Sequence, residues 1–347
     1  MCYAYVADVT SDQTETRTLR MGFLEGSMFV AGVVAGLTSG YTLQMLGFVA
    51  LFAVVLGVDL LMMVYVCCLP SVRYNRRFDP VAIPDEYHNR QLTDCSAEED
   101  AQVVNTKSPN STTPLNQTQA ASESSKSCLF GYISKPFAVV MDADDNMSSG
   151  VVVPMLCAFG VAIVAIVGER VVQTLYLRNQ PFFFTPKMIG YYISLQAGIR
   201  GVGAVVSTQM LYRVFKVNDF CMVIIGLISH ILVLVLTGLS TAVLTVYLVS
   251  IVGVCVPLPM AAIRSIITKS VPHDKYGTVL ASVSAVDVFA SFITNTVSLW
   301  MYDLTLSMYS GSVYFGICTF ALISLTIVAT TYIKQIIEMS RAGYQSI

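Results

Sequence analysis

The sequence predicts an all-α polytopic membrane protein, on three observations. Of its 347 residues, 55% are hydrophobic and 12% are charged, and the mean hydropathy is +0.67. Soluble domains carry about 25% charged residues, so this composition excludes one. Long apolar runs bounded by charged residues recur along the chain, and a bilayer-crossing helix needs about 20 such residues. The balance of 20 basic against 22 acidic residues provides no basic surface for a nucleic-acid partner.

Eight apolar runs are predicted as membrane-spanning helices. In chain order they are 21–40, 48–70, 151–175, 188–212, 220–239, 244–266, 277–301 and 311–333. Residues 1–7 are also apolar, but they are too few to span and are interpreted as the end of a further span.

The orientation follows from the basic residues, which alternate between the two sides of the predicted spans. The richer side holds Arg17, Arg20, Arg73, Arg76, Arg77, Arg213, Lys216, Lys269, Lys275, Lys334 and Arg341, whereas the other side holds Arg178 and Lys187. Cytoplasmic loops are enriched in Lys and Arg, so we expect the richer side and both chain ends to lie in the cytoplasm.

Residues 71–150 form the one long connection. From 105 to 127 they are rich in Ser, Thr, Asn and Gln, a composition that buries too little apolar surface to fold. We therefore predict four parts: 1–70 with two spans, a disordered cytoplasmic linker at 71–150, a six-helix bundle at 151–334, and a cytoplasmic tail at 335–347. The sequons at Asn110, Asn116 and Asn146 lie on the cytoplasmic side in this topology and are predicted to be unmodified.

Three carboxylates fall within predicted spans. Glu25 shares a helix face with Gly22, Gly32 and Gly36, small residues that let helix backbones approach closely, so it faces protein or a cavity. The alternative is a carboxylate near enough to the cytoplasmic end to reach water. Asp59 and Asp287 lie mid-span, where a lone charge costs about 3 kcal/mol. They are predicted to move protons or, equally, to be protonated groups that join helices.

Three arginines also fall within spans: Arg170, which follows Glu169, then Arg200 and Arg264. An arginine stays charged, so a buried one needs a carboxylate or an anionic ligand. Arg264 is the strongest candidate because Pro257 and Pro259 disrupt the helix before it, as in helices that line transporter cavities. The alternative is that Arg264 snorkels to the interface.

Several kinds of chemistry have no motif in the sequence. It contains no Walker A loop, His-Glu-x-x-His or Cys-x-x-Cys, and its three histidines are far apart. His230, in an apolar span, is more typical of a satisfied core residue than of a ligand. We therefore expect no metal, no cofactor and no enzymatic activity.

Several short stretches resemble a known family. Tyr5–Thr10, followed by Arg17, Arg20 and a glycine-rich span, resembles the junction of helices four and five in major facilitator transporters. Nearly the whole chain outside 71–150 is similar to solute carrier family 46, the family of the proton-coupled folate transporter. The matching stretches are Arg20–Glu25, Thr174–Tyr176, Lys187–Tyr191, and Arg264 followed by Gly277.

This resemblance implies the major facilitator fold, with the eight spans as helices 5–12 of twelve. It implies proton coupling at Glu25 and substrate and proton binding at Arg264. Arg200, Gln173 and Tyr176 are further candidates for substrate contact, and the candidate structural residues are Asp8, Arg17, Arg20, Gly32 and Gly36. Ile166 stands where the folate transporter has a histidine, which leaves the identity of the substrate open.

The expected function is proton-coupled symport of an organic anion, folate-like or otherwise hydrophilic, by alternating access. The rival interpretations are a non-transporting membrane scaffold or receptor that binds partners through 71–150, and an inactive truncated isoform. The ending Gly343–Ile347 resembles a sorting signal read by adaptor proteins, with Tyr344 and Ile347 as its key residues. We expect a plasma or endosomal/lysosomal membrane.

Overall fold

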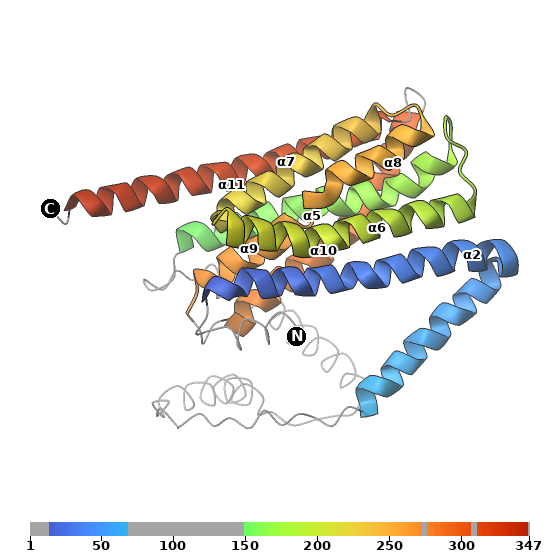
Figure 1. Cartoon of the computed structure of the whole chain (residues 1–347), viewed down its shortest axis with the longest axis horizontal. Coiled ribbons are helices and arrows are strands. Elements are labelled where there is room, and N and C mark those ends of the chain that lie inside the picture. The colour runs from blue at the N-terminus through green and yellow to red at the C-terminus, as the bar shows by residue number, and fades with distance from the viewer. Residues whose placement is uncertain (1–13, 69–148, 273–275, 307–310, 346–347) are drawn as a thin grey trace, which may run out of the picture. The chain divides into compact units, whose positions relative to one another are not determined.

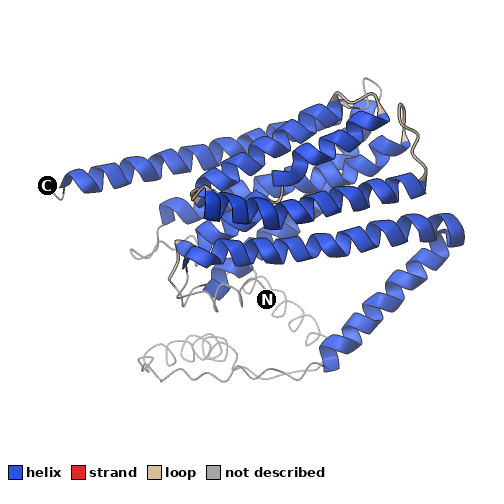
Figure 2. Cartoon of the chain, viewed as in Figure 1, coloured by secondary structure: helices blue, strands red, loops and turns tan. Residues whose placement is uncertain are grey.

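The computed structural model describes residues 14–68, 149–272, 276–306 and 311–345. All regular structure in these ranges is helical, and none of the described residues forms a strand (Figure 2). The fold is therefore all-α, as the apolar runs predict. The predicted linker at 71–150 and its sequons lie outside the described residues, apart from the first turn of a helix that begins at Ser149.

The helices are named in Figure 1, and their bounds are as follows. They are α2 (Thr14–Cys68), α5 (Ser149–Arg178), α6 (Pro186–Gln209) with the π-helical turn η1 (Met210–Val214), α7 (Asp219–Gly238), α8 (Val243–Val252), the 3-10 turn η2 (Gly253–Cys255), α9 (Leu258–Lys269), α10 (Tyr276–Leu306) and α11 (Ser312–Gln345). Helix α11 continues through most of the stretch that we predicted as a tail from residue 335.

Helix α2 contains two predicted spans joined at one residue. Gly47 has φ 77° and ψ −179°, which interrupts the helix. Glycine adopts positive φ without steric cost, so the chain can turn there without a longer loop. The chain divides into two compact units, Met1–Ala53 with Gly131–Ile347, and Val54–Phe130. In the second unit the described residues are the last turns of α2, and their large apolar side chains are exposed.

Seven stretches of the described residues are long and apolar enough to cross a membrane. They are Thr18–Met45, Gly47–Tyr65, Gly150–Arg178, Asp219–Gly238, Val243–Lys269, Tyr276–Thr305 and Ser312–Arg341. Helix α6, which we also predicted to span, has 24 residues and is long enough, at about 36 Å. It falls short in hydropathy, since its middle turns carry Ser194, Gln196 and Arg200.

The sixth predicted span is a broken helix. Helix α8 ends at Val252, η2 follows, and α9 begins at Leu258 directly after Pro257. Proline has no backbone N–H to donate, so Pro257 and Pro259 interrupt the regular hydrogen-bond ladder, as the sequence predicts. The bend fits against α7 because Gly226 has no side chain: a Cβ there would lie 2.3 Å from Cδ of Pro259. All residues of α9 from Leu258 to Thr268 are buried.

The first half of α2 packs closely against α6 (Figure 1). A Cβ on Gly36 would lie 2.4 Å from Ser194 Oγ, and a Cβ on Gly190 would lie 2.6 Å from the carbonyl oxygen of Gly36. Gly32 faces Ala197 in the same way. In lipid, such close backbone packing takes the place of the hydrophobic effect as the force that joins helices. The predicted glycine stripe therefore lies at the α2–α6 contact.

A polar cluster joins the start of α2 to α7 and α9. The ammonium of Lys269 donates to Asp219 Oδ2 at 2.6 Å and to Thr18 Oγ1 at 3.3 Å. The Thr18 hydroxyl also lies 2.7 Å from that of Ser265 and donates to Asp219 Oδ1 at 3.1 Å. The three contacts of Thr18 connect residues 201 to 251 positions apart in the chain, so they hold α2 on the later helices.

Candidate functional site

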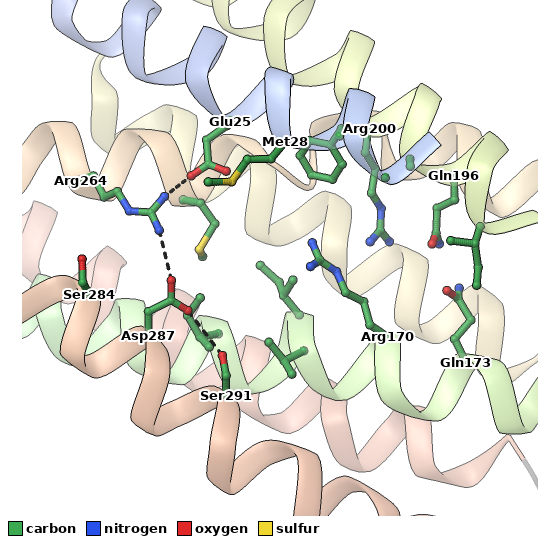
Figure 3. Close-up of a pocket in the computed structure, with 18 residues that line it drawn as sticks. Glu25, Met28, Arg170, Gln173, Gln196, Arg200, Arg264, Ser284, Asp287 and Ser291 are labelled. Carbon is green, nitrogen blue, oxygen red and sulfur yellow. Dashed lines mark hydrogen bonds and ion pairs between the residues drawn. The ribbon is translucent and has the colours of Figure 1, made fainter. Parts of the chain in front are cut away.

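A cavity of about 510 Å³ is lined by residues of α2, α5, α6, α9 and α10. All of its lining residues belong to the first compact unit. Most of the wall is apolar, and ten of the lining side chains, including every charged one, are labelled in Figure 3. The charged residues are Glu25, Arg170, Arg200, Arg264 and Asp287. The structure therefore brings five ionisable side chains from five helices to one space within the predicted spans.

Arg264 pairs with two of the predicted carboxylates (Figure 3). Its Nη1 donates to Glu25 Oε1, and its Nη2 lies 3.5 Å from Asp287 Oδ2. The guanidinium also lies over the ring of Phe159, 5.0 Å from the ring centroid, a distance at which the ring face attracts a cation. We call Glu25, Arg264 and Asp287 the acidic cluster, because two carboxylates share one guanidinium.

Burial decides between the alternatives for Glu25 and Arg264. The Arg264 side chain is 9% exposed and that of Glu25 is 10% exposed, so Arg264 does not snorkel and Glu25 does not reach water at the helix end. Asp287, at 37%, is the exposed member, and Ser291 Oγ donates to its Oδ1 at 3.5 Å. The proline break places Arg264 here, since it starts α9 in the interior.

Glu169 forms a second ion cluster behind the same cavity. Arg200 Nη2 donates to Glu169 Oε1 at 2.5 Å, and Gln196 Nε2 donates to the same oxygen at 3.4 Å. His230 Nε2 lies 3.1 Å from Glu169 Oε2. The Glu169 and His230 side chains are each 1% exposed and that of Arg200 is 3% exposed. We call Glu169, Arg200 and His230 the buried cluster.

Arg170 differs from the other two arginines. It lies on the cavity wall, exposed to the cavity, and Figure 3 shows its guanidinium and that of Arg200 pointing into the same space. Within the part of the chain that the structure describes, Arg170 makes no hydrogen bond and no ion pair. Gln173, one turn further along α5, also lines the cavity, and its Nε2 donates to the Tyr192 hydroxyl at 3.2 Å.

The remaining predicted residues lie elsewhere. The Tyr176 hydroxyl contacts the backbone carbonyl oxygens of Thr237 and Ser240, at 3.2 and 3.0 Å, and Tyr176 does not line the cavity. Asp59 is exposed in the second compact unit. Arg20 is exposed near the start of α2. Asp8, Ile347 and the side chains of Arg17 and Tyr344 lie outside the described residues.

Sequence reasoning did not identify Glu169 as a site residue, although its position next to Arg170 was an indication. Consecutive residues on a helix point about 100° apart, so Glu169 and Arg170 face different neighbours and do not neutralise each other. Each therefore needs a partner on another helix. His230 is a buried core residue, as the sequence predicts, but only its Nε2 has a partner: among the described residues its Nδ1 makes no hydrogen bond.

The part of the chain that the structure describes contains no group of three or more His, Cys, Asp or Glu residues that could hold a metal ion.

A family model described as Major Facilitator Superfamily matches residues 1–295. The chain belongs to the major facilitator superfamily. Membership of this superfamily fits the apolar helices and the broken α8–α9 helix, and together with the seven candidate spans it marks the chain as a multi-pass membrane protein.

Two curated superfamily relatives share the name lysosomal proton-coupled steroid conjugate and bile acid symporter SLC46A3. The Gallus gallus protein is 23% identical over 310 residues, which are 89% of this chain and 57% of the relative. The Mus musculus protein is 21% identical over 322 residues, 90% of this chain and 58% of the relative. The chain thus spans less than three fifths of the length of these relatives. Their names confirm the predicted resemblance to solute carrier family 46, and they describe transporters rather than enzymes.

Proposed function

We propose that this chain takes part in proton-coupled symport of an organic anion by alternating access. One observation carries the proposal: two carboxylates, Glu25 and Asp287, share a single arginine, Arg264, in a mostly apolar cavity. When both are ionised, the acidic cluster holds one uncompensated negative charge. One proton removes that charge, and a neutral carboxyl is far easier to bury than an ionised one. Proton binding would therefore favour a state in which the cavity is closed.

The anion specificity rests on the arginines. Arg170, Arg200 and Arg264 all line the cavity, and each remains charged at any working pH. Protonation of Glu25 or Asp287 leaves the cavity with more positive charge, which favours an anionic substrate. A proton and an anion would then bind together, and that coupling is what a symporter requires. Asp59 remains a less favoured proton site because it does not line this cavity.

The relatives are named for steroid conjugates and bile acids, which are amphipathic organic anions. We propose this class for the present chain, because apolar side chains such as Met28, Phe29 and Ile163 make up much of the cavity wall. A folate-like anion remains a further candidate.

Because the relatives are named lysosomal, we also propose a lysosomal or endosomal membrane, with adaptor proteins that recognise Tyr344 and Ile347.

The conformational change in this proposal is rocking of the first half of α2 against α5 to α11. The α2–α6 contact supports a sliding motion, since it is built from glycines with few side chains to interlock. Glu25 would move with α2, whereas Arg264 and Asp287 would move with α9 and α10. The ion pair between them would thus form and break with each cycle.

Uptake of radiolabelled bile-acid and folate anions into cells that express the chain tests this function, at acidic and at neutral external pH. We expect uptake stimulated by acid, and loss of that stimulation in Glu25→Gln. The matched control is Asp303→Asn, an exposed carboxylate on α10 outside the cavity, which should behave as wild type.

The same uptake should be measured in a chimera that completes the chain with the remaining segment of a relative. Uptake in the chimera alone would assign transport to the longer protein. No uptake in either form would contradict the proposal and favour the scaffold or receptor interpretation.

A further inference from the structure

We propose that Arg170, and not Arg264, binds the anionic group of the substrate, and that each monoanion enters with one proton held by Glu25 and Asp287. This inference rests on the proposed function and assigns the parts of its site. It differs from the expectation that Arg264 pairs with the substrate. The argument compares what each of the three cavity arginines already contacts.

Arg264 has the most negative charge around it. Glu25 and Asp287 both contact its guanidinium, and the ring of Phe159 lies beneath it. An anion bound here would meet two carboxylates at close range. When a proton neutralises one of these carboxylates, Arg264 still forms a one-to-one ion pair with the other. Arg264 is therefore better suited to hold the proton site in place than to bind an anion.

Arg200 is also compensated. Its Nη2 donates to Glu169 Oε1 at 2.5 Å, and both side chains are almost completely buried. His230 contacts the other oxygen of the same carboxylate. The pair of Arg200 and Glu169 carries no net charge, and Arg200 contributes only the N–H groups that it does not give to Glu169.

Arg170 is the one cavity arginine to which the structure assigns no ion-pair partner. Within the described residues it makes no hydrogen bond and no ion pair, although it is exposed on the cavity wall. Asp287 and Glu25 are held by Arg264, across the cavity in Figure 3. An isolated guanidinium at membrane depth is costly, so such residues pair with an anionic group or mark a pathway. A ligand oxyanion supplies that group.

The surroundings of Arg170 fit an amphipathic anion. Ile163, Ile166 and Val167 precede it by seven, four and three positions, so they share its helix face, and all three line the cavity. A guanidinium offers parallel N–H donors to two oxygens of a carboxylate or sulfate group. The apolar body of such a ligand would lie along the three aliphatic side chains while its oxyanion meets Arg170.

The charges of the cavity then determine a stoichiometry. The acidic cluster holds two carboxylates and one guanidinium, a surplus of one negative charge. The other end holds Arg170 and Arg200 against Glu169, a surplus of one positive charge. One proton on Glu25 or Asp287 and one monoanion on Arg170 compensate both ends. Transport of one monoanion with one proton moves no net charge across the membrane.

The test is bile-acid uptake by the full chain, or by the chimera if only the chimera transports, in liposomes. We expect Arg170→Gln to raise the half-saturation concentration at least about tenfold, as loss of a charge-assisted bidentate contact implies. Acid stimulation of the remaining uptake should persist, because the proton site is intact. Arg178→Gln, an exposed arginine on the same helix outside the cavity, is the matched control and should show no change.

Arg170→Lys keeps the charge but loses the paired donors, so we expect a smaller rise of about threefold. If only the lysine variant folds, an unchanged half-saturation concentration overturns the proposal. It is also overturned if Arg170→Gln binds the anion as wild type does while a folded Arg264→Gln no longer binds it.

An imposed membrane potential should leave uptake unaffected, and a potential-driven current would refute the one-to-one stoichiometry. Absence of acid-stimulated uptake in wild type would instead contradict the proposed function.

Discussion

The two ion clusters beside the cavity contain the same kinds of side chain but differ in how they are built. The acidic cluster joins α2 to α9 and α10, and its most exposed member, Asp287, is 37% exposed. The buried cluster joins α5, α6 and α7, and none of its side chains is more than 3% exposed. All three members of the acidic cluster line the cavity, whereas only Arg200 of the buried cluster does.

This difference indicates which of the two clusters we expect to act in transport and which we expect to stabilise the fold. A buried pair whose carboxylate is met by several donors holds its helices in one arrangement, and breaking it leaves a charge without compensation. A cluster with excess carboxylate at a contact between helices can change its protonation and its geometry together. Function is therefore expected to depend on the acidic cluster, and folding on the buried cluster.

The largest effect is expected for Glu169→Gln. This change leaves Arg200 charged and enclosed without its carboxylate, which should destabilise the protein by about 3–5 kcal/mol. Thermal unfolding of the purified protein in detergent would measure the loss. The double variant Glu169→Gln with Arg200→Gln should recover part of it, since no uncompensated charge remains. If Glu25→Gln destabilised the protein as much as Glu169→Gln, the distinction between the two clusters would be lost.

An intermediate effect is expected for Gly190→Ala. The added Cβ would lie 2.6 Å from the Gly36 carbonyl oxygen and 2.9 Å from Gly40 Cα. Both contacts are backbone atoms that cannot rotate aside, so α2 must move away from α6 at a cost of about 1–3 kcal/mol. Gly277→Ala is the matched control, because no atom of the described residues lies within 4 Å of its added Cβ.

Double-mutant cycles then sharpen the comparison. Displacing α2 moves Glu25 but not Glu169. The effects of Gly190→Ala and Glu25→Gln on the free energy of unfolding should therefore differ from their sum by more than about 0.5 kcal/mol. The effects of Gly190→Ala and Glu169→Gln should simply add. Equal coupling to both carboxylates would mean that α2 supports the buried cluster as well.

The smallest effect is expected for Lys269→Gln, which removes the ammonium from the polar cluster at the start of α2. The Lys269 side chain is 28% exposed, so solvent screens its contact with Asp219 and the loss should be no more than about 1 kcal/mol. Thermal unfolding at low and high salt would measure it, and the difference from wild type should shrink as salt rises. A loss as large as that of Glu169→Gln would show that α2 depends on this contact.

Much of the fold could be predicted from the sequence because spans are local properties. Apolar runs placed the helices, and the two prolines before Arg264 placed the break between α8 and α9. Helix α6 shows the limit of hydropathy, since its polar residues find partners on other helices: Ser194 donates to the Val33 carbonyl oxygen, and Gln196 and Arg200 donate to Glu169. The single-residue turn at Gly47 was located only as a gap between two predicted spans, because a glycine does not reveal its φ in advance.

The site was predictable residue by residue but not as a set of pairs. Glu25 and Arg264 each required a partner, yet they are 239 positions apart, and only the packing of α2 against α9 brings them together. Glu169 was noted only as the neighbour of Arg170, and its contact with Arg200, 31 positions away, depends on the packing of α5 against α6. Which arginine stays without a carboxylate depends on three helix–helix contacts, and composition does not determine those.

Helix α6 has a consequence for the synthesis of the protein. By hydropathy it does not qualify as a span, although the helices before and after it do. A segment with an arginine at its centre partitions poorly from the translocon into lipid when it emerges alone. Helix α5 is synthesised first and carries Glu169, the carboxylate that Arg200 meets. We therefore expect α6 to enter the bilayer as a pair with α5, so the buried cluster would act during membrane insertion before it acts in the finished fold.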